Sequence, residues 1–147
     1  MRVVVQRVSS SKVEVDSRVI GEIGEGLLVL VGFTDGDNEE IIDKVINKIV
    51  NLRIFPDEND LMNKSVLDVN KEVLSVSQFT LYADVAKGRR PSFVKALNPT
   101  DASNLYDLFN KKLSKYVKVQ TGKFRSTMKV SLVNEGPCTI IIDSNDL

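Results

Sequence analysis

The chain has 147 residues, 42% of them hydrophobic, and its 20 basic and 20 acidic residues give a formal net charge of zero. It contains one cysteine, Cys138, and no histidine. This composition excludes an intrachain disulfide, a Ser-His-Asp or Cys-His catalytic group, and a zinc site made of cysteine and histidine ligands. Any catalysis must use Asp, Glu, Lys or Tyr side chains, hydroxyls, backbone N–H groups or groups of the substrate.

The length is that of one ordinary domain, and the apolar content is sufficient for a core. We therefore expect a single domain over residues 1–147. The apolar runs at residues 3–5 and 27–31 are too short for a signal peptide or a membrane span. The single cysteine fits a reducing compartment, so we predict a cytoplasmic protein that does not bind a membrane.

The first third of the chain has the pattern of β-strands separated by turn residues. The expected strands are residues 2–8, 12–15, 19–23 and 26–33. The segment 27–31 is apolar throughout, which predicts a strand buried on both faces. Apolar residues then recur at helical spacing over residues 41–50, and Asp37 with Glu40 predicts a capping box at the start of this helix.

The rest of the chain combines short strands with a second helix. We expect strands at residues 53–55, 72–81, 128–133 and 139–143, and a frayed end at residues 144–147. Asn98 and Pro99 have the residue types of an N-cap and a first helical position, so a helix begins there. Its apolar positions are predicted to face the core: Ala102, Leu105, Tyr106, Phe109 and Leu113. The chain reads as one α/β domain in which antiparallel pairing dominates.

Charge is unevenly distributed along the sequence. Residues 14–72 contain 14 acidic and 6 basic residues, whereas residues 85–131 contain 11 basic and 2 acidic residues. Such segregation favours one basic face, which suits a polyanion such as RNA. The alternative is a fold that interleaves the two halves and evens out the field.

The segment 75–84 is denser in polar residues than a purely structural strand requires. Ser77, Gln78 and Thr80 are candidate site residues, because the last N–H groups of a strand are unpaired and can point at a developing oxyanion. The alternative is the solvent-facing side of a half-buried strand, where serine and threonine are common. Local pattern alone leaves both interpretations open.

The step from Gly136 to Pro137, between two expected strands, is the second notable feature. Proline fixes φ and lacks a donor, and glycine leaves space around the backbone, so the step can present two bare carbonyl oxygens. A plain hairpin turn is the alternative, since Gly-Pro pairs are common in turns.

Together these segments resemble the D-aminoacyl-tRNA deacylases over nearly the whole chain. The two most specific motifs are Ser77-Gln78-x-x-Leu81 and Asn134-x-Gly136-Pro137-x-Thr139. Further similar segments occur in the family's order: Arg7-Val8, Gly21-Glu22-Ile23-Gly24, Gly26-Leu27-Leu28-Val29-Leu30, Arg53-Ile54-Phe55, Met62-Asn63 and Arg90-Pro91-Ser92-Phe93. The resemblance implies an α+β fold with a mainly antiparallel, barrel-like β core and two main amphipathic helices.

The resemblance also implies an enzyme that hydrolyses the ester between a D-amino acid and the terminal adenosine of tRNA, without metal or cofactor. Such a catalyst needs no histidine, because an aminoacyl ester is already activated. Backbone N–H groups around Ser77 and Phe79 would hold the carbonyl oxygen, and Gln78 would place the adenosine. Thr80 has no adjacent base, so we expect it to orient substrate or water rather than attack.

In the family the Gly-Pro bond is cis and its carbonyls accept hydrogen bonds from the α-ammonium of the substrate. The resemblance therefore implies that Gly136 and Pro137, with Asn134 and Thr139, bind substrate. A D side chain would point to open space and an L side chain into the backbone, while glycine would not be rejected. The motif reaches the partner's active site in the family, which implies a homodimer with two composite sites.

Two positions depart from the family pattern. Cys138 replaces a larger apolar residue and is expected to be buried. Arg125 stands where small residues are usual, and either bracing of the Gly-Pro loop or contact with tRNA would explain it. The loop with Lys87, Arg89 and Arg90 is a candidate for binding tRNA phosphates, with a solvated basic loop as the alternative. Two other functions remain open: an editing domain of related fold, and an RNA-binding module without activity.

Overall fold

The computed structural model describes residues 1–147, which form eight strands, two α-helices and two short 3-10 helices. In chain order these are β1 (Arg2–Val15), β2 (Arg18–Ile23), β3 (Gly26–Gly32), α1 (Glu39–Asn51), β4 (Phe55–Pro56), β5 (Met62–Lys64), β6 (Glu72–Ser77), η1 (Phe79–Tyr82), α2 (Pro99–Leu113), β7 (Val119–Thr121), β8 (Lys129–Asp143) and η2 (Ser144–Asp146). No helix combines the length and hydropathy that a membrane span needs.

Six strands form one curled, barrel-like sheet, in which β2, β1, β3, β6 and β7 are neighbours in that order and β8 pairs with β1. Antiparallel pairing was expected to dominate, and β1 is antiparallel to β2, β3 and β8, but β6 is parallel to both β3 and β7. The sheet is therefore mixed. Parallel neighbours need long crossover connections, and here α1 lies in the connection from β3 to β6 and α2 in that from β6 to β7.

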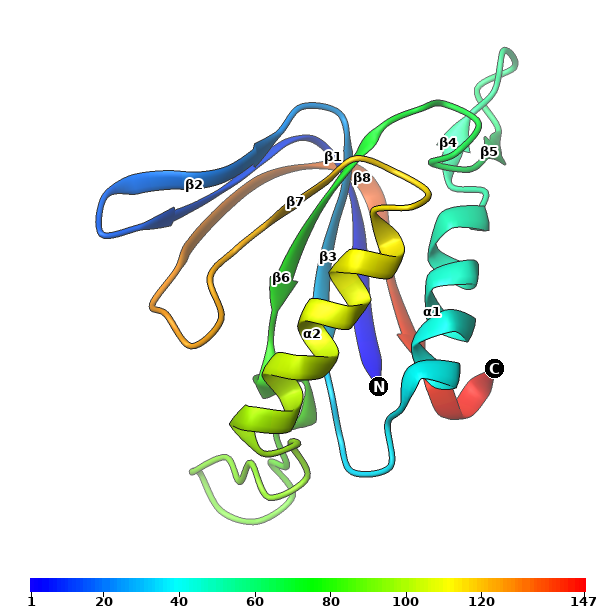
Figure 1. The fold of residues 1–147 in the computed structure, drawn as a ribbon. Helices are drawn as coiled ribbons and strands as arrows, with labels where there is room; N and C mark the ends of the chain where they lie inside the picture. Colours follow the sequence, from blue (N-terminus) through cyan, green and yellow to red (C-terminus); the bar gives the residue numbers. More distant parts are fainter.

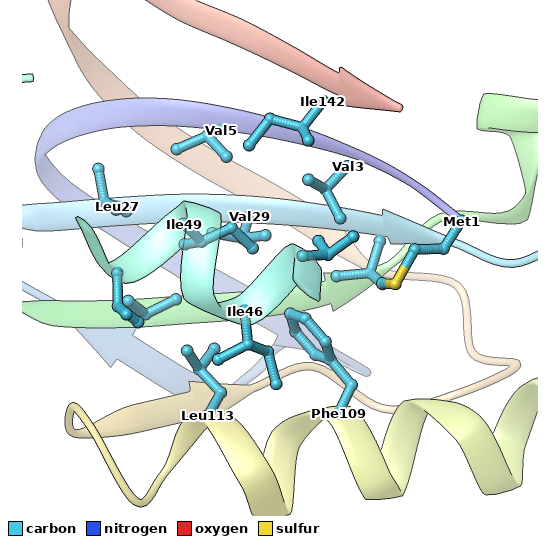
Figure 2. Packing of buried hydrophobic residues seen from close by; sticks show 14 of the residues in the cluster. Met1, Val3, Val5, Leu27, Val29, Ile46, Ile49, Phe109, Leu113 and Ile142 are labelled. Carbon is cyan, nitrogen blue, oxygen red and sulfur yellow. The ribbon is translucent and has the colours of Figure 1, made fainter. Parts of the chain in front are cut away.

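Both helices cover the same side of the sheet (Figure 1). Their apolar faces and the facing side chains of β1, β3 and β6 form the main core (Figure 2), which includes Val3, Val29, Ile46 and Phe109. A smaller cluster of buried residues fills the inside of the curled sheet: Val8, Val13, Ile23, Leu28, Leu74 and Val76. Strand β3 contributes to both clusters, which confirms the prediction that it is buried on both faces.

Several element boundaries differ from the sequence-based expectations. Strand β1 is continuous across the predicted break at residues 9–11, and β8 runs through the Gly136–Pro137 step without a reversal. Both are long because each pairs with the other over most of its length, including Ser10 and Ser11 of β1. Strand β6 ends at Ser77 instead of residue 81, and η1 follows it directly. Residues 53–55 form a strand only at Phe55–Pro56.

The two helix starts differ in how well the sequence predicted them. The predicted cap of α2 is confirmed, because the Asn98 side chain accepts a hydrogen bond from the Asp101 N–H at 3.0 Å. The predicted capping box of α1 is wrong: its N-cap is Asn38, which accepts from the Ile41 N–H at 3.0 Å.

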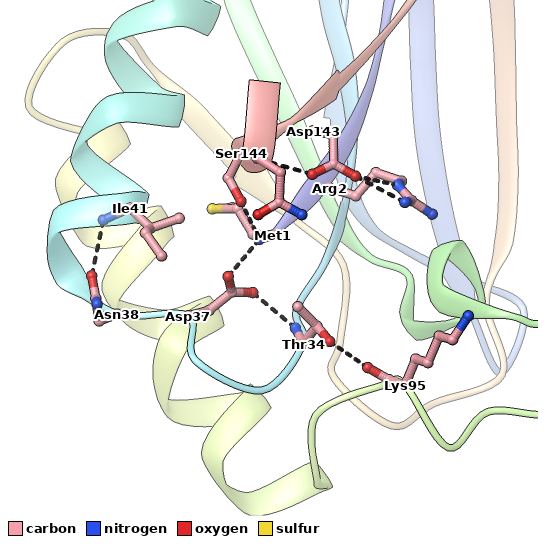
Figure 3. Close-up of polar contacts among 10 residues, drawn as sticks. Met1, Arg2, Thr34, Asp37, Asn38, Ile41, Lys95, Asp143 and Ser144 are labelled. Carbon is pink, nitrogen blue, oxygen red and sulfur yellow. Dashed lines mark hydrogen bonds and ion pairs between the residues drawn. The ribbon is translucent and has the colours of Figure 1, made fainter. Parts of the chain in front are cut away.

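Asp37 is instead used in a network at the N-terminus (Figure 3). Its carboxylate accepts hydrogen bonds from the Met1 ammonium at 2.5 Å and from the Thr34 N–H at 2.8 Å. The Met1 ammonium also donates to the Ser144 hydroxyl at 2.7 Å. Residues 144–146 form η2 and are tied to Met1, so the expectation of a frayed end is wrong there.

Candidate active site

A cavity of about 700 Å³ opens at the C-terminal end of β6. Its first wall is the strand end with Ser77, Gln78 and Phe79, and its second is the loop containing Phe93. The third wall is the segment 124–128, which follows β7. This volume lies in the range of small-molecule sites.

The first wall is formed where β6 leaves the sheet. Ser77 pairs with Val31 of β3, and the Gln78 N–H makes the last hydrogen bond to that strand, to the Val31 carbonyl at 2.7 Å. The chain then turns into η1, whose first N–H groups, at Phe79 and Thr80, donate to no backbone carbonyl. The N–H groups of Phe79 and Thr80 at the strand end therefore have no backbone acceptor.

The polar side chains of this wall interact with each other. The Gln78 amide donates a hydrogen bond to the Thr80 hydroxyl. Thr80 does not line the cavity, and its hydroxyl has neither an imidazole nor a lysine ammonium as a hydrogen-bond partner. The glycine at position 32 allows this wall to pack closely, since a Cβ there would be 3.0 Å from the Gln78 carbonyl oxygen.

Arg2, which does not line the cavity, anchors η1. Its guanidinium donates to the Leu81 carbonyl at 2.8 Å and lies 4.9 Å from the centre of the Tyr82 ring. It also pairs with Asp143 at 2.8 Å, as Figure 3 shows. Burial would raise the pKa of Asp143, but the Asn145 N–H and Arg2 bind the carboxylate and bring its pKa below the ordinary value of 3.8. Burial raises the pKa of the Tyr82 hydroxyl far above 10, so Tyr82 is neutral at physiological pH.

The second wall is held to the end of β3. The Thr34 hydroxyl donates to the Lys95 carbonyl at 2.5 Å, and the Leu97 N–H donates to the Phe33 carbonyl at 3.0 Å. Phe93 meets Phe79 edge to face, with ring centres 5.1 Å apart. The first and second walls therefore share an aromatic contact at the cavity edge.

Tyr106 connects the third wall to the sheet. Its hydroxyl donates to the Ser75 carbonyl at 2.8 Å, and its ring lies 6.1 Å from that of Phe124. Tyr106 is buried, as predicted, and burial raises the pKa of its hydroxyl. Sequence reasoning did not place the segment 124–128 in the site. The only indication in the sequence that this segment matters was that Arg125 departs from the family pattern.

The Gly136–Pro137 step lies elsewhere, in β8. The bond is cis, as the resemblance implied. The Asn134 amide donates to the Arg7 carbonyl at 3.0 Å and to the Cys138 carbonyl at 3.1 Å, while the Arg7 guanidinium donates to the Glu135 carbonyl at 3.1 Å. The carbonyls on both sides of the step are thus occupied, whereas Gly136 and Pro137 themselves are exposed.

Asn134 and Thr139 brace this loop within the chain. A Cβ at Gly136 would come 2.8 Å from the Asn134 side-chain oxygen, so the loop fits closely around that amide. The Thr139 hydroxyl accepts from the Gln6 amide at 3.1 Å. Cys138 is 5% exposed and joins the main core, which confirms its prediction as a buried residue.

The structure does not bring the two sequence motifs together within one chain. Through the pairing of β8, β1, β3 and β6, Asn134 is level with Glu72 at the start of β6, whereas Ser77 ends that strand. Five residues of strand and three strand spacings correspond to a separation of roughly 20 Å. None of residues 134–139 lines the cavity.

The basic loop follows η1 directly. Asp84 and Ser92 exchange backbone hydrogen bonds of 2.8 and 2.9 Å, which close the loop that carries Lys87, Arg89 and Arg90. These three residues are exposed and form no ion pair. Other lysines of the basic half do pair with the acidic half.

The clearest of these pairs joins the two helices. Lys112 of α2 contacts Glu39 and Asp43 of α1 at 2.7 and 2.8 Å. The fold thus pairs some basic residues of the second half with acidic residues of the first half. The loop with Lys87, Arg89 and Arg90 remains without acidic partners.

Comparison with known proteins assigns the chain to a family. The sequence model of D-Tyr-tRNA(Tyr) deacylase matches residues 4–143. The chain belongs to this family. A relative from Sulfurihydrogenibium sp. (strain YO3AOP1), described as a D-aminoacyl-tRNA deacylase, is 54% identical over 147 residues, all of both chains.

Two solved structures agree with this deacylase family fold. One, described as c-Myc DNA Unwinding Element Binding Protein, has a TM-score of 0.92 at 39% identity, covering 97% of this chain and 98% of that chain. The other, of a probable eukaryotic D-amino acid tRNA deacylase, has a TM-score of 0.82 at 20% identity, covering 96% of this chain and 97% of that chain. The second likeness concerns the fold alone.

The lining residues of the cavity in this deacylase family member offer the free N–H of Phe79, hydroxyls, two side-chain amides and aromatic rings. Arg125 is the only charged side chain among its lining residues. No group of three or more His, Cys, Asp or Glu side chains is arranged to hold a metal ion. This set of groups can bind a neutral or anionic ligand and stabilise an oxyanion.

Proposed function

We infer that this protein is a D-aminoacyl-tRNA deacylase, which hydrolyses the ester bond of D-aminoacyl-tRNA to free D-amino acid and tRNA. The observation that carries this inference is the full-length match to the Sulfurihydrogenibium relative of that name, together with the family match over residues 4–143. The cavity supports it, because the unpaired N–H of Phe79, which lines the cavity, suits ester hydrolysis without an imidazole.

The reaction adds water to the ester carbonyl, passes through a tetrahedral oxyanion and breaks the bond to the ribose oxygen, which leaves with a proton from the water. The N–H groups at the end of β6, with that of Phe79 foremost, hold the oxyanion. Gln78, oriented by Thr80, positions the terminal adenosine, and the free hydroxyl of its ribose helps to activate the water. Thr80 acts on Gln78 and makes no covalent bond.

The Gly136–Pro137 step completes the active site of a second copy in a homodimer. The step cannot reach Ser77 of its own chain, which lies roughly 20 Å away along and across the sheet. Strand β8 pairs only with β1, so its other edge is free, and Val133 and Ile141 of this strand are 56% and 69% exposed. A free edge with exposed apolar residues suits a symmetric contact between two copies.

Chirality is selected by the backbone of this step. The carbonyls of the exposed residues Gly136 and Pro137 accept hydrogen bonds from the α-ammonium, while the oxyanion donors hold the oxygen of the ester carbonyl. With both groups fixed, a D side chain points to open space and an L side chain meets the backbone. Glycine has no side chain to clash, so glycyl-tRNA is also a substrate.

The unpaired loop with Lys87, Arg89 and Arg90 binds phosphates of the tRNA. It lies between η1 and Phe93, both of which border the cavity. Each phosphate contact releases counterions, so affinity for tRNA falls steeply with salt. In the Arg89→Ala/Arg90→Ala variant, affinity for tRNA should fall less steeply with salt concentration. An unchanged salt dependence would show that the loop is solvated and does not bind tRNA phosphates.

One assay tests the activity against its alternatives. The protein is incubated with matched D-aminoacyl-, L-aminoacyl- and glycyl-tRNA, and loss of the ester is followed. Loss of the D ester and the glycyl ester, with the L ester intact, is expected. Another acyl preference would indicate a different editing activity, and binding without turnover would indicate an RNA-binding module.

Mixed dimers test the composite site. Phe79→Pro removes a donor from one wall, and Gly136→Val changes the step that reaches the partner. Each variant alone is expected to be nearly inactive. If the site is shared, half of the randomly formed dimers contain both variants and each of these has one intact site, so about a quarter of the activity returns. No recovery on mixing would place the whole site in one chain.

A further inference from the structure

The proposed catalysis assigns no role to Arg125, the one charged residue that lines the cavity. It lies in the third wall, is exposed, and is the only charged residue lining a cavity that contains no acidic group. It forms no ion pair with any acidic residue of the chain. A guanidinium without a carboxylate partner, at the wall of a ligand-sized cavity, is available to an anion.

The backbone at this position also favours a different residue. Arg125 has a φ of +59°, in the left-handed region that suits glycine. Arginine is therefore not explained by the conformation of the loop. Its flanking residue Lys123 is also basic and exposed but does not line the cavity, so it provides a matched control.

We propose that Arg125 binds the phosphodiester group on the 5′ side of the terminal adenosine of tRNA. This inference rests on the proposed function, which places the ribose ester at the first wall near Phe79. The 5′-phosphate is the anionic group nearest to that ribose, and Arg125 is the only cation that lines the cavity. A guanidinium can form two parallel hydrogen bonds to the phosphate oxygens.

Binding of two small ligands tests this assignment without relying on turnover. The ligands are adenosine and adenosine 5′-(methyl phosphate), whose single negative charge is that of a phosphodiester. We expect the wild-type protein to bind the phosphate ester at least about tenfold more tightly than adenosine, as a charge-assisted hydrogen bond provides. In Arg125→Gly the ratio of the two affinities should fall to about one.

Two further variants separate charge from fold. Arg125→Lys keeps the charge and should retain part of the preference, and Lys123→Ala should retain all of it. Glycine suits a positive φ, so Arg125→Gly should unfold at the wild-type temperature or above. An equal preference in the wild type and Arg125→Gly would overturn the proposal, as would an equal loss in Lys123→Ala.

Hydrolysis of D-aminoacyl-tRNA by the same protein preparations is measured in a separate assay, which distinguishes the failure of this proposal from the failure of the proposed function. Loss of ester with no phosphate preference would overturn the role of Arg125 and leave the deacylase function standing. A phosphate preference without ester loss would support Arg125 as a phosphate-binding residue and refute the proposed activity.

Discussion

Replacement of Phe79 by proline tests the proposed oxyanion donors with a single substitution. Catalysis by a backbone N–H cannot be removed by truncating a side chain, but proline lacks this group. The structure permits the change, because Phe79 is the first residue of η1 and its N–H makes no backbone hydrogen bond. Proline is well tolerated at a first helical position. The preceding Gln78 is not helical, with φ −144° and ψ 79°.

The expected loss is large in catalysis and small in stability. One oxyanion donor contributes about 3 to 4 kcal/mol to transition-state stabilisation, so kcat should fall by about 10² to 10³. The proline also removes an aromatic ring that is 55% exposed and contacts Phe93. Phe79→Ala removes the same ring and keeps the N–H, and is therefore the matched control.

The assay compares single-turnover hydrolysis of D-aminoacyl-tRNA by Phe79→Pro, Phe79→Ala and wild type. We expect Phe79→Ala within about tenfold of the wild-type rate, since the lost ring contact is worth about 1 kcal/mol. Thermal unfolding of both variants should match within a few degrees. Equal rates for Phe79→Pro and Phe79→Ala, with both proteins folded, would refute the assignment of this N–H to the oxyanion.

Three other predictions concern the surroundings of the site. Thr80→Ala should keep the rate within about tenfold, because it removes one hydrogen bond to Gln78; a loss near 10⁴ would show a nucleophile. Tyr106→Phe removes one of the two donors to the Ser75 carbonyl, which keeps the hydrogen bond from the Gly122 N–H, and should lower stability by about 1 kcal/mol, seen as a lower unfolding temperature. The pKa of Asp143 is lower in the folded protein than its ordinary value of 3.8, so the ionised carboxylate stabilises the fold above pH 3.8. This contribution is lost as the pH falls through the folded-state pKa. The free energy of unfolding of the wild type in urea should therefore exceed that of Asp143→Asn by less at pH 3 than at pH 6.

Local sequence signals predicted the elements whose chemistry is contained within a few residues. Asn98 and Pro99 identified the start of α2, and the apolar run of β3 identified a strand between two cores. The end of β6 was placed four residues too late, because Phe79 and Leu81 continue the alternation of a strand. Their 3-10 geometry depends on the Leu81 carbonyl bound by Arg2, about 80 residues away in sequence.

The remaining parts of the site depend on contacts between distant segments. The segment 124–128 carries no motif, and it becomes a cavity wall through the packing of Phe124 on Tyr106. Parallel pairing of β6 follows from the two helical connections and cannot be read from the strand residues themselves. The separation of Ser77 from the Gly136–Pro137 step follows from the register of four strands.

The close packing at Gly32 and Gly136 has a consequence for how this protein tolerates mutation. Backbone N–H and carbonyl groups are retained in most substitutions, because only the side chain changes. In a saturation mutagenesis selected for activity, Ser77 and Thr80 should therefore accept several replacements. Gly32 and Gly136 should accept fewer replacements than these two residues, because an added Cβ would lie 3.0 Å from the Gln78 carbonyl oxygen or 2.8 Å from the Asn134 side-chain oxygen.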